Sequence, residues 1–511
     1  MMEKTEKLHI NIKTAWTLTV FVLFCFYMFW PVNFYLAESV KATYYMIVVP
    51  LLVGGVLYFR RLRDGLEYRF LVGFWLWFCL TRIINGNPTL KYDFQFVFDL
   101  ALMLPFLALG LSQTRDERRI FLDSLSAAVG GYHFAVGLIA LSAFLRRTII
   151  INPITEGSLG IIAEYDYARI NIFDTHANVT GYWFLMALFL MIYEFFACRK
   201  KLWRIPILLS AAVDLIVIAI TYSRSVRVSM ALALALMTAV LLYTWLHKKS
   251  RLLCGVVVTV GMLAVAWAAF EGSALCADVM ATLSYEISGT RPLAETVQQA
   301  ELPEDDGLAE AGETAGSGRD PHAIVTTLSI RAGEMKASPM ELSSKGLVHS
   351  DPRPKTGTLD ELSSARLQIW RSAFQAIGVD PSILWKGQLV KDTMTVANTF
   401  SDPEATGGEP AHFHNSLIQV LMTTGIPGLL FAGGFLVLLV FHSLRLLFSS
   451  ESSVSLETRM LALPVIASLP HFMLEAALFT TCDVRTLFFF LMCGMALGAE
   501  RSIVKTEEKT E

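Results

Sequence analysis

The sequence has little charge for its length. Of its 511 residues, only 17% are Asp, Glu, Lys or Arg and 54% are hydrophobic, whereas an ordinary soluble domain is about 25% charged. Basic and acidic residues nearly balance, 42 against 45, and residues 272–411 hold 20 acidic but only 11 basic residues. No basic stripe is present to neutralise the phosphates of a duplex, which excludes nucleic acid as a partner. The composition indicates a polytopic membrane protein.

Cysteine pairs and a cleavable leader are also missing. The seven cysteines include no Cys-x-x-Cys pair, so the sequence predicts neither a zinc ribbon nor a disulfide framework. Lys4, Lys7 and Lys13 precede the first apolar run, but no small-residue cleavage site follows that run. We therefore expect residues 1–14 to be a cytoplasmic N-terminus that leads into a retained first helix.

Apolar stretches long enough to cross about 30 Å of hydrocarbon are abundant. Basic clusters mark cytoplasmic loops, and they recur on alternate loops near Arg60, Arg115, Arg199 and Lys248. The predicted fold is an all-α polytopic helical bundle with both termini in the cytoplasm. Twelve spans are expected, at residues 15–32, 43–59, 68–84, 94–112, 119–145, 179–198, 203–221, 227–246, 252–270, 426–447, 460–479 and 485–499.

This topology places one large loop outside the cytoplasm. We expect spans one to nine within residues 15–271, the loop at 272–411, the end of the loop with spans ten to twelve at 412–500, and a cytoplasmic tail at 501–511. Within the loop, residues 301–321 are acidic and rich in Gly and Ala, which predicts disorder. Residues 363–378 predict an amphipathic helix. Its expected apolar stripe consists of Leu367, Trp370, Phe374 and Ile377.

Two arginines lie where the positive-inside rule predicts few cations. Arg224 and Arg227 are expected at the outer face, between the seventh and eighth spans. A guanidinium offers paired donors to phosphate oxygens and stays protonated. The alternative is that both arginines snorkel among lipid headgroups. We favour phosphate binding for Arg224 and the headgroup interpretation for Arg227.

A histidine pair stands where the loop re-enters the membrane. A neutral imidazole at His414 can take a proton from a sugar hydroxyl. Asn415 is equally well explained as the N-cap of the next helix. His412 and His414 would suit a metal, but no third ligand stands at a recognisable spacing. We therefore expect no metal and no cofactor.

Further polar residues occur in the loop helix and within spans. Arg366 stands one turn before Trp370, which predicts either a cation–π contact or a second phosphate clamp. His471 and Glu475 share one face of the predicted eleventh span. Intramembrane charges usually face the interior of a bundle or a cavity.

Two more acids lie inside predicted spans. Asp99 falls in the fourth span and Asp214 in the seventh. For both we favour hydrogen bonds between helices.

Four segments, in this order, resemble the bacterial O-antigen ligase and polymerase superfamily of membrane glycosyltransferases. The resemblance covers about residues 165–480, and it implies a glycan donor linked through diphosphate to undecaprenol, a glycan or lipid acceptor, and surrounding membrane lipid. The segments are Arg169…His176-x-Asn178, Ser223-Arg224-Ser225, Arg366-x-x-x-Trp370 and His414-Asn415…Gly425-Ile-Pro-Gly428.

The resemblance also implies residue roles and a place of action. It implies a metal-independent, inverting transfer at the outer face of the cytoplasmic membrane, facing the periplasm or the cell exterior. Arg224 and Arg366 would neutralise the leaving diphosphate, and His414 would accept the proton of the acceptor hydroxyl. His176, Glu164 and Asp166 are the alternative bases. The implied substrate-binding residues are Arg227, Arg169, His176, Asn178, His412, Asn415 and Trp370.

Other functions stay open. A polymerase of the same superfamily adds repeat units to a growing chain, whereas a ligase transfers the finished glycan, and the single large loop favours the ligase. A lipid-linked sugar flippase or transporter would also use membrane arginines, but no paired halves with interrupted helices are visible. A purely structural membrane subunit would not need Arg224 and His414.

Overall fold

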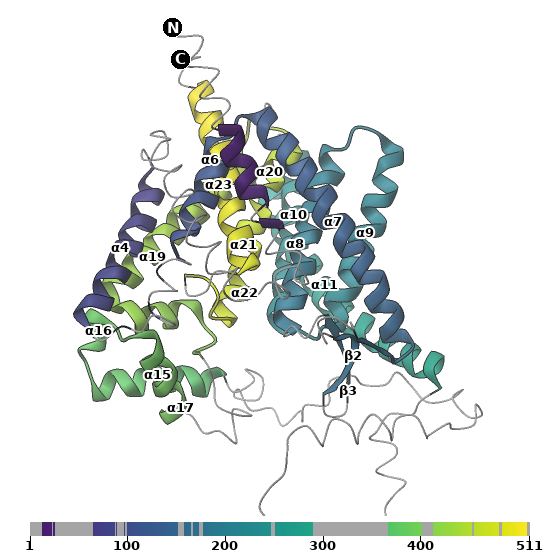
Figure 1. Ribbon diagram of the computed structural model, residues 1–511. Coiled ribbons are helices and arrows are strands. Elements are labelled where there is room, and N and C mark those ends of the chain that lie inside the picture. Colours follow the sequence, from purple (N-terminus) through teal and green to yellow (C-terminus); the bar gives the residue numbers. More distant parts are fainter. Residues whose placement is uncertain are drawn as a thin grey trace, which may run out of the picture.

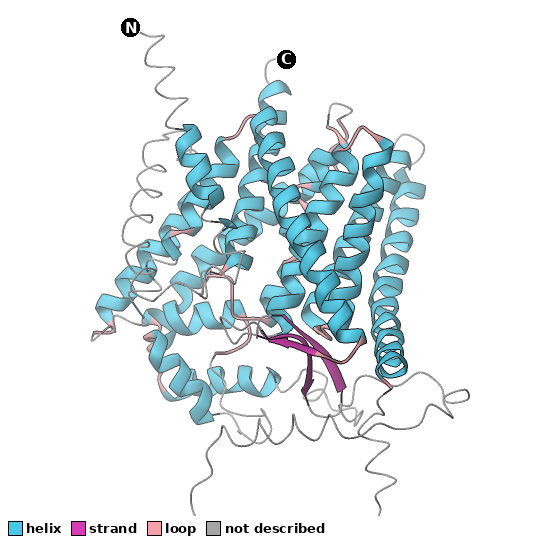
Figure 2. Ribbon diagram, turned by 45° about the vertical axis from the view of Figure 1, so that its right-hand side comes forward, coloured by secondary structure: helices cyan, strands magenta, loops and turns pink. Residues whose placement is uncertain are grey.

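A computed structural model describes most of the predicted bundle. It covers residues 13–22, 24–25, 65–86, 88, 93, 97, 100–151, 158–164, 167–172, 177–246, 251–289, 366–400, 412–451, 454–479 and 483–507. The expected second span at 43–59, the expected disorder at 301–321 and Asp99 lie outside these residues. The structure is predominantly helical (Figures 1 and 2), as the sequence predicts, and it adds a small sheet that the all-α prediction omits.

The described helices and strands follow one another along the chain in the order below. They are α4 (Leu66–Ile84), α6 (Met103–Ser112), α7 (Arg115–Leu145), β1 (Ile149–Ile151), β2 (Ser158–Glu164), β3 (Tyr167–Ile172), α8 (Ala177–Ala197), η3 (Lys201–Trp203), α9 (Arg204–Ile220), α10 (Arg224–Leu246), α11 (Arg251–Ser288), α15 (Arg366–Val379), α16 (Ile383–Lys386), α17 (Val390–Phe400), α19 (Ser416–Leu447), α20 (Leu456–Met460), α21 (Leu463–Ala467), α22 (Leu469–Leu474) and α23 (Val484–Glu507).

Two helices form the centre of the bundle. In their most apolar windows, 78% of the residues of α8 and 83% of those of α23 are buried, against 6% for α11. Because α11 exposes Leu, Val and Trp side chains along its length, it presents an apolar outer surface of the kind that faces lipid. Close approach helps to form the centre, since a Cβ added to Gly110 of α6 would lie 2.3 Å from the backbone of Gly494 in α23. Small residues allow such contacts between membrane helices.

Seven described helices are long and apolar enough to cross a membrane. They correspond to predicted spans five to ten and twelve. Helix α4 covers all of predicted span three, and α6 is a shorter apolar helix within span four. The seven helices support an integral membrane protein, while the number twelve stays a prediction. Two boundaries also differ, because α11 continues past residue 271 to Ser288 and α19 begins ten residues before 426.

The predicted span at 460–479 is not one helix. It consists of the end of α20, then α21 and α22, and the chain becomes extended at Glu475, with φ −141° and ψ 137°. Pro464 and Pro470 explain the interruptions, since proline lacks an N–H and clashes with the preceding turn. His471 and Glu475 therefore lie on a broken segment, where side chains and backbone can turn toward a common point.

One end of the bundle carries the sheet and the loop helices. Strands β1, β2 and β3 form an antiparallel sheet in this order, with Ile161 opposite Ile170 and Ile162 opposite Arg169. The sheet lies at the same end as α15, α16 and α17, and the two chain termini lie at the other end (Figure 1). The sheet replaces irregular loop in the predicted segment between α7 and α8.

Helix α15 buries a different face from the predicted stripe. Its buried residues are Ile369, Ser372, Ala373 and Ala376, whereas Phe374 is 59% exposed. Ile369, Ala373 and Ala376 pack with Phe413 and Met422 in a cluster separate from the main core. Small side chains at 372, 373 and 376 let α15 lie close to its neighbours. Of the predicted stripe, Ile377 packs against the edge of this cluster and Phe374 is left outside.

The loop before α17 is attached to the bundle by backbone contacts. Gln388 N donates to Met422 O at 2.8 Å in α19, and Arg82 of α4 donates to Gln388 O at 2.8 Å. Arg82 also pairs with Asp93, whose Oδ1 accepts from Val390 N at 3.1 Å. These bonds fix α16 and the start of α17 against α4 and α19.

Candidate active site

Glu475 is the point at which the predicted site residues meet. It is 6% exposed and lies in the extended segment after α22, outside the seven candidate spans. Its Oε1 accepts hydrogen bonds from Asn178 Nδ2 at the start of α8 and from Arg366 Nη2 at the start of α15, the latter at 2.9 Å. Segments that are far apart in the sequence are thus joined through one carboxylate.

His414 approaches the other oxygen of the same carboxylate. Its Nδ1 lies 3.7 Å from Glu475 Oε2, longer than a hydrogen bond, and no other hydrogen bond satisfies Nδ1. His414 has φ +47°, which is uncommon for a residue with a side chain and is typical of functional sites held by surrounding structure. The rings of His412 and His414 are 4.1 Å apart, and His414 N donates to His412 Nδ1 at 3.2 Å.

Helix α19 begins directly after His414 with a hydrogen-bonded N-cap. Asn415 Oδ1 accepts from Leu417 N at 2.9 Å and Ile418 N at 3.1 Å, which is the geometry of an N-cap. Ser416 Oγ donates to Glu475 O at 2.8 Å. The cap and this serine hold the His414 backbone beside Glu475.

A hydrogen-bonded chain of side chains leads to Glu475 from the other side. His471 Nε2 lies 3.4 Å from Arg485 Nη1 and His471 Nδ1 lies 3.1 Å from Ser225 Oγ. Ser225 Oγ is 3.3 Å from Ser223 Oγ, which donates to Asn178 Oδ1 at 2.6 Å. These contacts connect Arg485 to Glu475 through His471, the two serines and Asn178.

Arg224 opens α10 between the two serines of this chain. Ser223 and Ser225, its neighbours in sequence, contact Asn178 and His471, so the Arg224 backbone lies beside the cluster. Its side chain is half-buried. Arg227, one turn further on, donates to Ser273 Oγ at 2.6 Å and Phe270 O at 3.0 Å, both on α11. These contacts direct Arg227 to α11 rather than to Glu475.

The remaining predicted residues are placed less closely. Arg169 lies in β3, opposite Ile162, and His176 lies outside the described residues. Trp370 is half-buried on α15. The structure gives Arg366 an ion pair with Glu475 and no cation–π contact with Trp370, although both residues are described. Both carboxylate oxygens of Asp214 are buried without a hydrogen-bond partner, in contrast to the expected bond between helices.

Charge and burial act in opposite directions on Glu475. Burial alone would raise the pKa of its carboxyl group, but the approach of His414 and the positive charges of His471 and Arg366 lower that pKa below its ordinary value. Glu475 is therefore ionised and balances Arg366. One bond from Nη2 does not exhaust a guanidinium, which has five N–H donors, so Arg366 can hold Glu475 and an anion together.

The sequence did not single out part of this network. Asp483 and Arg485 form an ion pair at 2.5 Å, and Arg485 continues to His471. A signal existed, because Asp483 and Arg485 place two opposite charges at the edge of the predicted span 485–499, and charges beside apolar spans often pair with one another. The described residues contain no group of three or more His, Cys, Asp or Glu that could hold a metal ion.

Part of the chain matches a known protein family. Residues 209–433 match the family model described as O-antigen ligase, and a search of curated proteins finds no match. The matched range includes Arg224, Arg366 and His414, whereas His471 and Glu475 lie beyond it. The predicted resemblance to the O-antigen ligase superfamily is confirmed. With the apolar helices, it supports an integral membrane enzyme of polysaccharide biosynthesis.

Proposed function

We propose that this protein transfers a glycan from an undecaprenyl-diphosphate carrier to an acceptor hydroxyl at the outer face of the cytoplasmic membrane. The observation that carries the proposal is the convergence of Arg366 and His414 on Glu475, inside a chain whose residues 209–433 match the O-antigen ligase family. A cation for a leaving diphosphate and a base for an acceptor are thus held at one point. The acceptor proposed first is a lipid or protein, as for a ligase.

The arginines serve the leaving group in this proposal. As the bond between the anomeric carbon and the diphosphate oxygen breaks, its electron pair passes to the diphosphate. Arg366 neutralises that charge with N–H donors that Glu475 already holds in place, so little reorganisation is needed at the moment of reaction. Arg224, whose backbone lies beside the same cluster, supplies the second cation. Fixed cations then do what a divalent metal does in other glycosyltransferases, and the transfer proceeds without a metal.

His414 serves the acceptor. The acceptor oxygen attacks the anomeric carbon from the face opposite to the diphosphate, which inverts the configuration, and its proton passes to the imidazole. Since Nδ1 faces Glu475, a proton on Nδ1 leaves Nε2 as the nitrogen that accepts. The ionised Glu475 stabilises the imidazolium that forms. His414 later releases the proton to water or to the diphosphate product.

Transfer with purified components tests the proposal. The protein in lipid nanodiscs receives an undecaprenyl-diphosphate-linked glycan and a hydroxyl acceptor, in excess chelator. We expect turnover of His414→Ala to fall about 10²–10⁴-fold while its affinity for the donor is unchanged. Arg366→Ala should lose both turnover and donor binding. Arg371→Ala is the matched control, because Arg371 is an exposed arginine on the same helix. Loss of activity in chelator that a divalent ion restores contradicts the metal-free mechanism.

The choice of acceptor separates the two branches of the superfamily. A ligase transfers glycan to the lipid or protein acceptor when it is supplied, whereas a polymerase lengthens the carrier-linked glycan without it. Lengthening alone would assign the polymerase reaction. Movement of the labelled donor across the bilayer without a new glycosidic bond would assign a flippase.

A further inference from the structure

A polar cavity lies at the opposite end of the bundle from the candidate active site. It has a volume of about 250 Å³ and lies between the start of α7, the end of α8 with the chain that follows, and α20. These elements stand at the end that carries the chain termini, away from α15 and α17 (Figure 1). Its lining consists of Arg115, Asp116, Arg118, Arg119, Tyr193, Arg199, Glu457, Thr458 and Leu461.

Arg118 is buried in the wall of this cavity without a carboxylate partner. It is 5% exposed, its Nη2 donates to Gln113 O at 3.2 Å, and its Nε has no hydrogen-bond partner. A buried charge is costly unless it is paired and hydrogen-bonded. The cationic loops of a membrane protein explain exposed arginines, but they do not explain one that is enclosed.

The other charges of the cavity leave a positive excess. Four arginines face two carboxylates, those of Asp116 and Glu457. Glu457 lies 3.7 Å from Arg115, which is 74% exposed, and Arg119 pairs at 3.8 Å with Asp123 outside the cavity. Such long, solvated pairs contribute little. Arg118 and Arg199 thus stay without a carboxylate neighbour among the ion pairs of the described residues.

We propose that this cavity binds a phosphate group, as a binding site separate from the transfer site. Guanidinium groups match phosphate oxygens with paired donors, and basic pockets between membrane helices bind the headgroups of anionic lipids. The phosphate is carried by the headgroup of an anionic phospholipid or by a soluble phosphate or diphosphate. Arg118 supplies the enclosed donors and Arg199 closes the site from its exposed side.

Binding with two classes of probe tests this proposal. The purified full-length protein is placed in nanodiscs of phosphatidylcholine alone or with cardiolipin, and a parallel series in phosphatidylcholine receives inorganic diphosphate. The midpoint of thermal unfolding and the number of bound lipids in native mass spectrometry are recorded. We expect one probe to stabilise the protein, and we expect Arg118→Gln to weaken that binding about tenfold or more.

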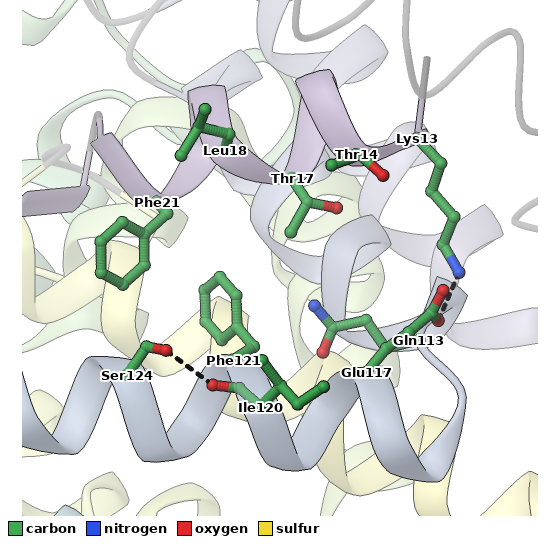
Figure 3. Close-up of a pocket in the computed structure, with 10 residues that line it drawn as sticks. All are labelled: Lys13, Thr14, Thr17, Leu18, Phe21, Gln113, Glu117, Ile120, Phe121 and Ser124. Atoms are coloured by element: carbon green, nitrogen blue, oxygen red, sulfur yellow. Dashed lines mark hydrogen bonds and ion pairs between the residues drawn. The ribbon is translucent and has the colours of Figure 1, made fainter. Parts of the chain in front are cut away.

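Matched variants distinguish a site from general attraction. Lys13→Gln removes a cation from the same end of the bundle, where Lys13 pairs with Glu117 and lines a separate cavity of about 450 Å³ (Figure 3). Lys201→Gln removes an exposed one. Neither change should alter binding. Arg199→Gln replaces Arg118→Gln if the latter does not fold, because Arg199 is exposed.

The measured binding distinguishes a lipid headgroup, a soluble phosphate and the absence of a specific site. Stabilisation by cardiolipin that depends on Arg118 or Arg199 supports a lipid headgroup, and the same dependence with diphosphate alone supports a soluble phosphate. Equal binding by the wild type and both arginine variants overturns the proposal. So does an equal loss in Lys13→Gln and Lys201→Gln, since the effect would then be general attraction to a basic surface.

Discussion

Glu475 and Arg366 form a nearly buried pair whose two halves depend on each other. Removing one partner of such a pair leaves an uncompensated charge, at a cost of about 3–5 kcal/mol. We expect Arg366→Met and Glu475→Gln each to lower the free energy of unfolding by that order. The double variant should recover much of the loss but no transfer activity. Thermal unfolding and transfer assays on the four proteins measure this, and independent, additive losses would contradict a direct pair.

The ionisation of Glu475 predicts a dependence of stability on pH. Because its pKa is lowered in the folded protein, the ionised carboxylate contributes stability above the unfolded pKa of about 4.3, and this contribution is lost as the pH falls further. We expect the difference in unfolding midpoint between the wild type and Glu475→Gln to be constant from neutral pH to about pH 5.5 and to narrow below about pH 4.3. Glu286→Gln, at an exposed glutamate of α11, should show no difference. If the difference in unfolding midpoint between the wild type and Glu475→Gln already disappears near neutral pH, Glu475 is not ionised in the folded protein.

The sequence identifies reactive side chains more readily than the residues that they contact in the fold. Arg366 and His414 stand out because a cation and an imidazole occur where an outer loop meets apolar spans. Their common partner does not, since Glu475 is 109 residues from Arg366 and 61 from His414. Only the folded topology brings such residues together. The sequence marks Glu475 as an intramembrane acid at i+4 from His471, but the broken segment, not a shared helical face, determines its contacts.

Among the elements, α19 contains the turn that locks the outer loop to the bundle. Gly425 has φ +68° inside this helix, and an added Cβ would lie 2.7 Å from Leu384 O. Gly425→Ala should therefore destabilise the protein by about 1–3 kcal/mol and reduce transfer, because α16 would move away. Gly433→Ala is the matched control on the same helix, since nothing lies within 4 Å of its Cβ position.

The control variant Gly433→Ala should not destabilise the protein and can stabilise it. Alanine is favoured over glycine inside a helix by about 1 kcal/mol, so Gly433→Ala should leave the unfolding midpoint unchanged or raise it. Hydrogen exchange of residues 383–390 would report the release of the loop in Gly425→Ala. Equal unfolding midpoints and equal hydrogen exchange for the two variants would show that the close contact at Gly425 does not stabilise the loop.

Helices with a long, uninterrupted apolar run are predictable from the sequence. The short strands and the helices interrupted by proline are not. The long apolar runs of α8, α10 and α23 were expected from length and hydropathy. The sheet was missed, although Arg169-Ile170-Asn171-Ile172 alternates polar and apolar residues as a strand does. Hydropathy predicts one span at 460–479 because it does not detect the effect of Pro464 and Pro470, whose missing N–H groups break the helix.

For the whole molecule, charge distribution is the main guide to how the bundle sits in the membrane. Arg115, Arg118 and Arg199 gather at the end that carries the termini, and the positive-inside rule assigns such an end to the cytoplasm. The loop helices α15, α16 and α17, together with His414 and Glu475, would then face outward. Charge predicts which end is which, while the packing of helices around α8 and α23 followed only from the fold.

Cysteine labelling of intact cells decides this orientation. Two exposed positions at opposite ends serve as reporters in a background without native cysteines: Gln375 on α15 and Lys201 in η3. We expect a maleimide that does not cross membranes to label Gln375→Cys in intact cells, and Lys201→Cys only after the cytoplasmic membrane is permeabilised. A diphosphate-linked donor presented at the outer face can reach Arg366 and His414 only in that arrangement. Labelling of Lys201→Cys first would place the candidate active site in the cytoplasm and remove the physical basis for transfer at the cell exterior.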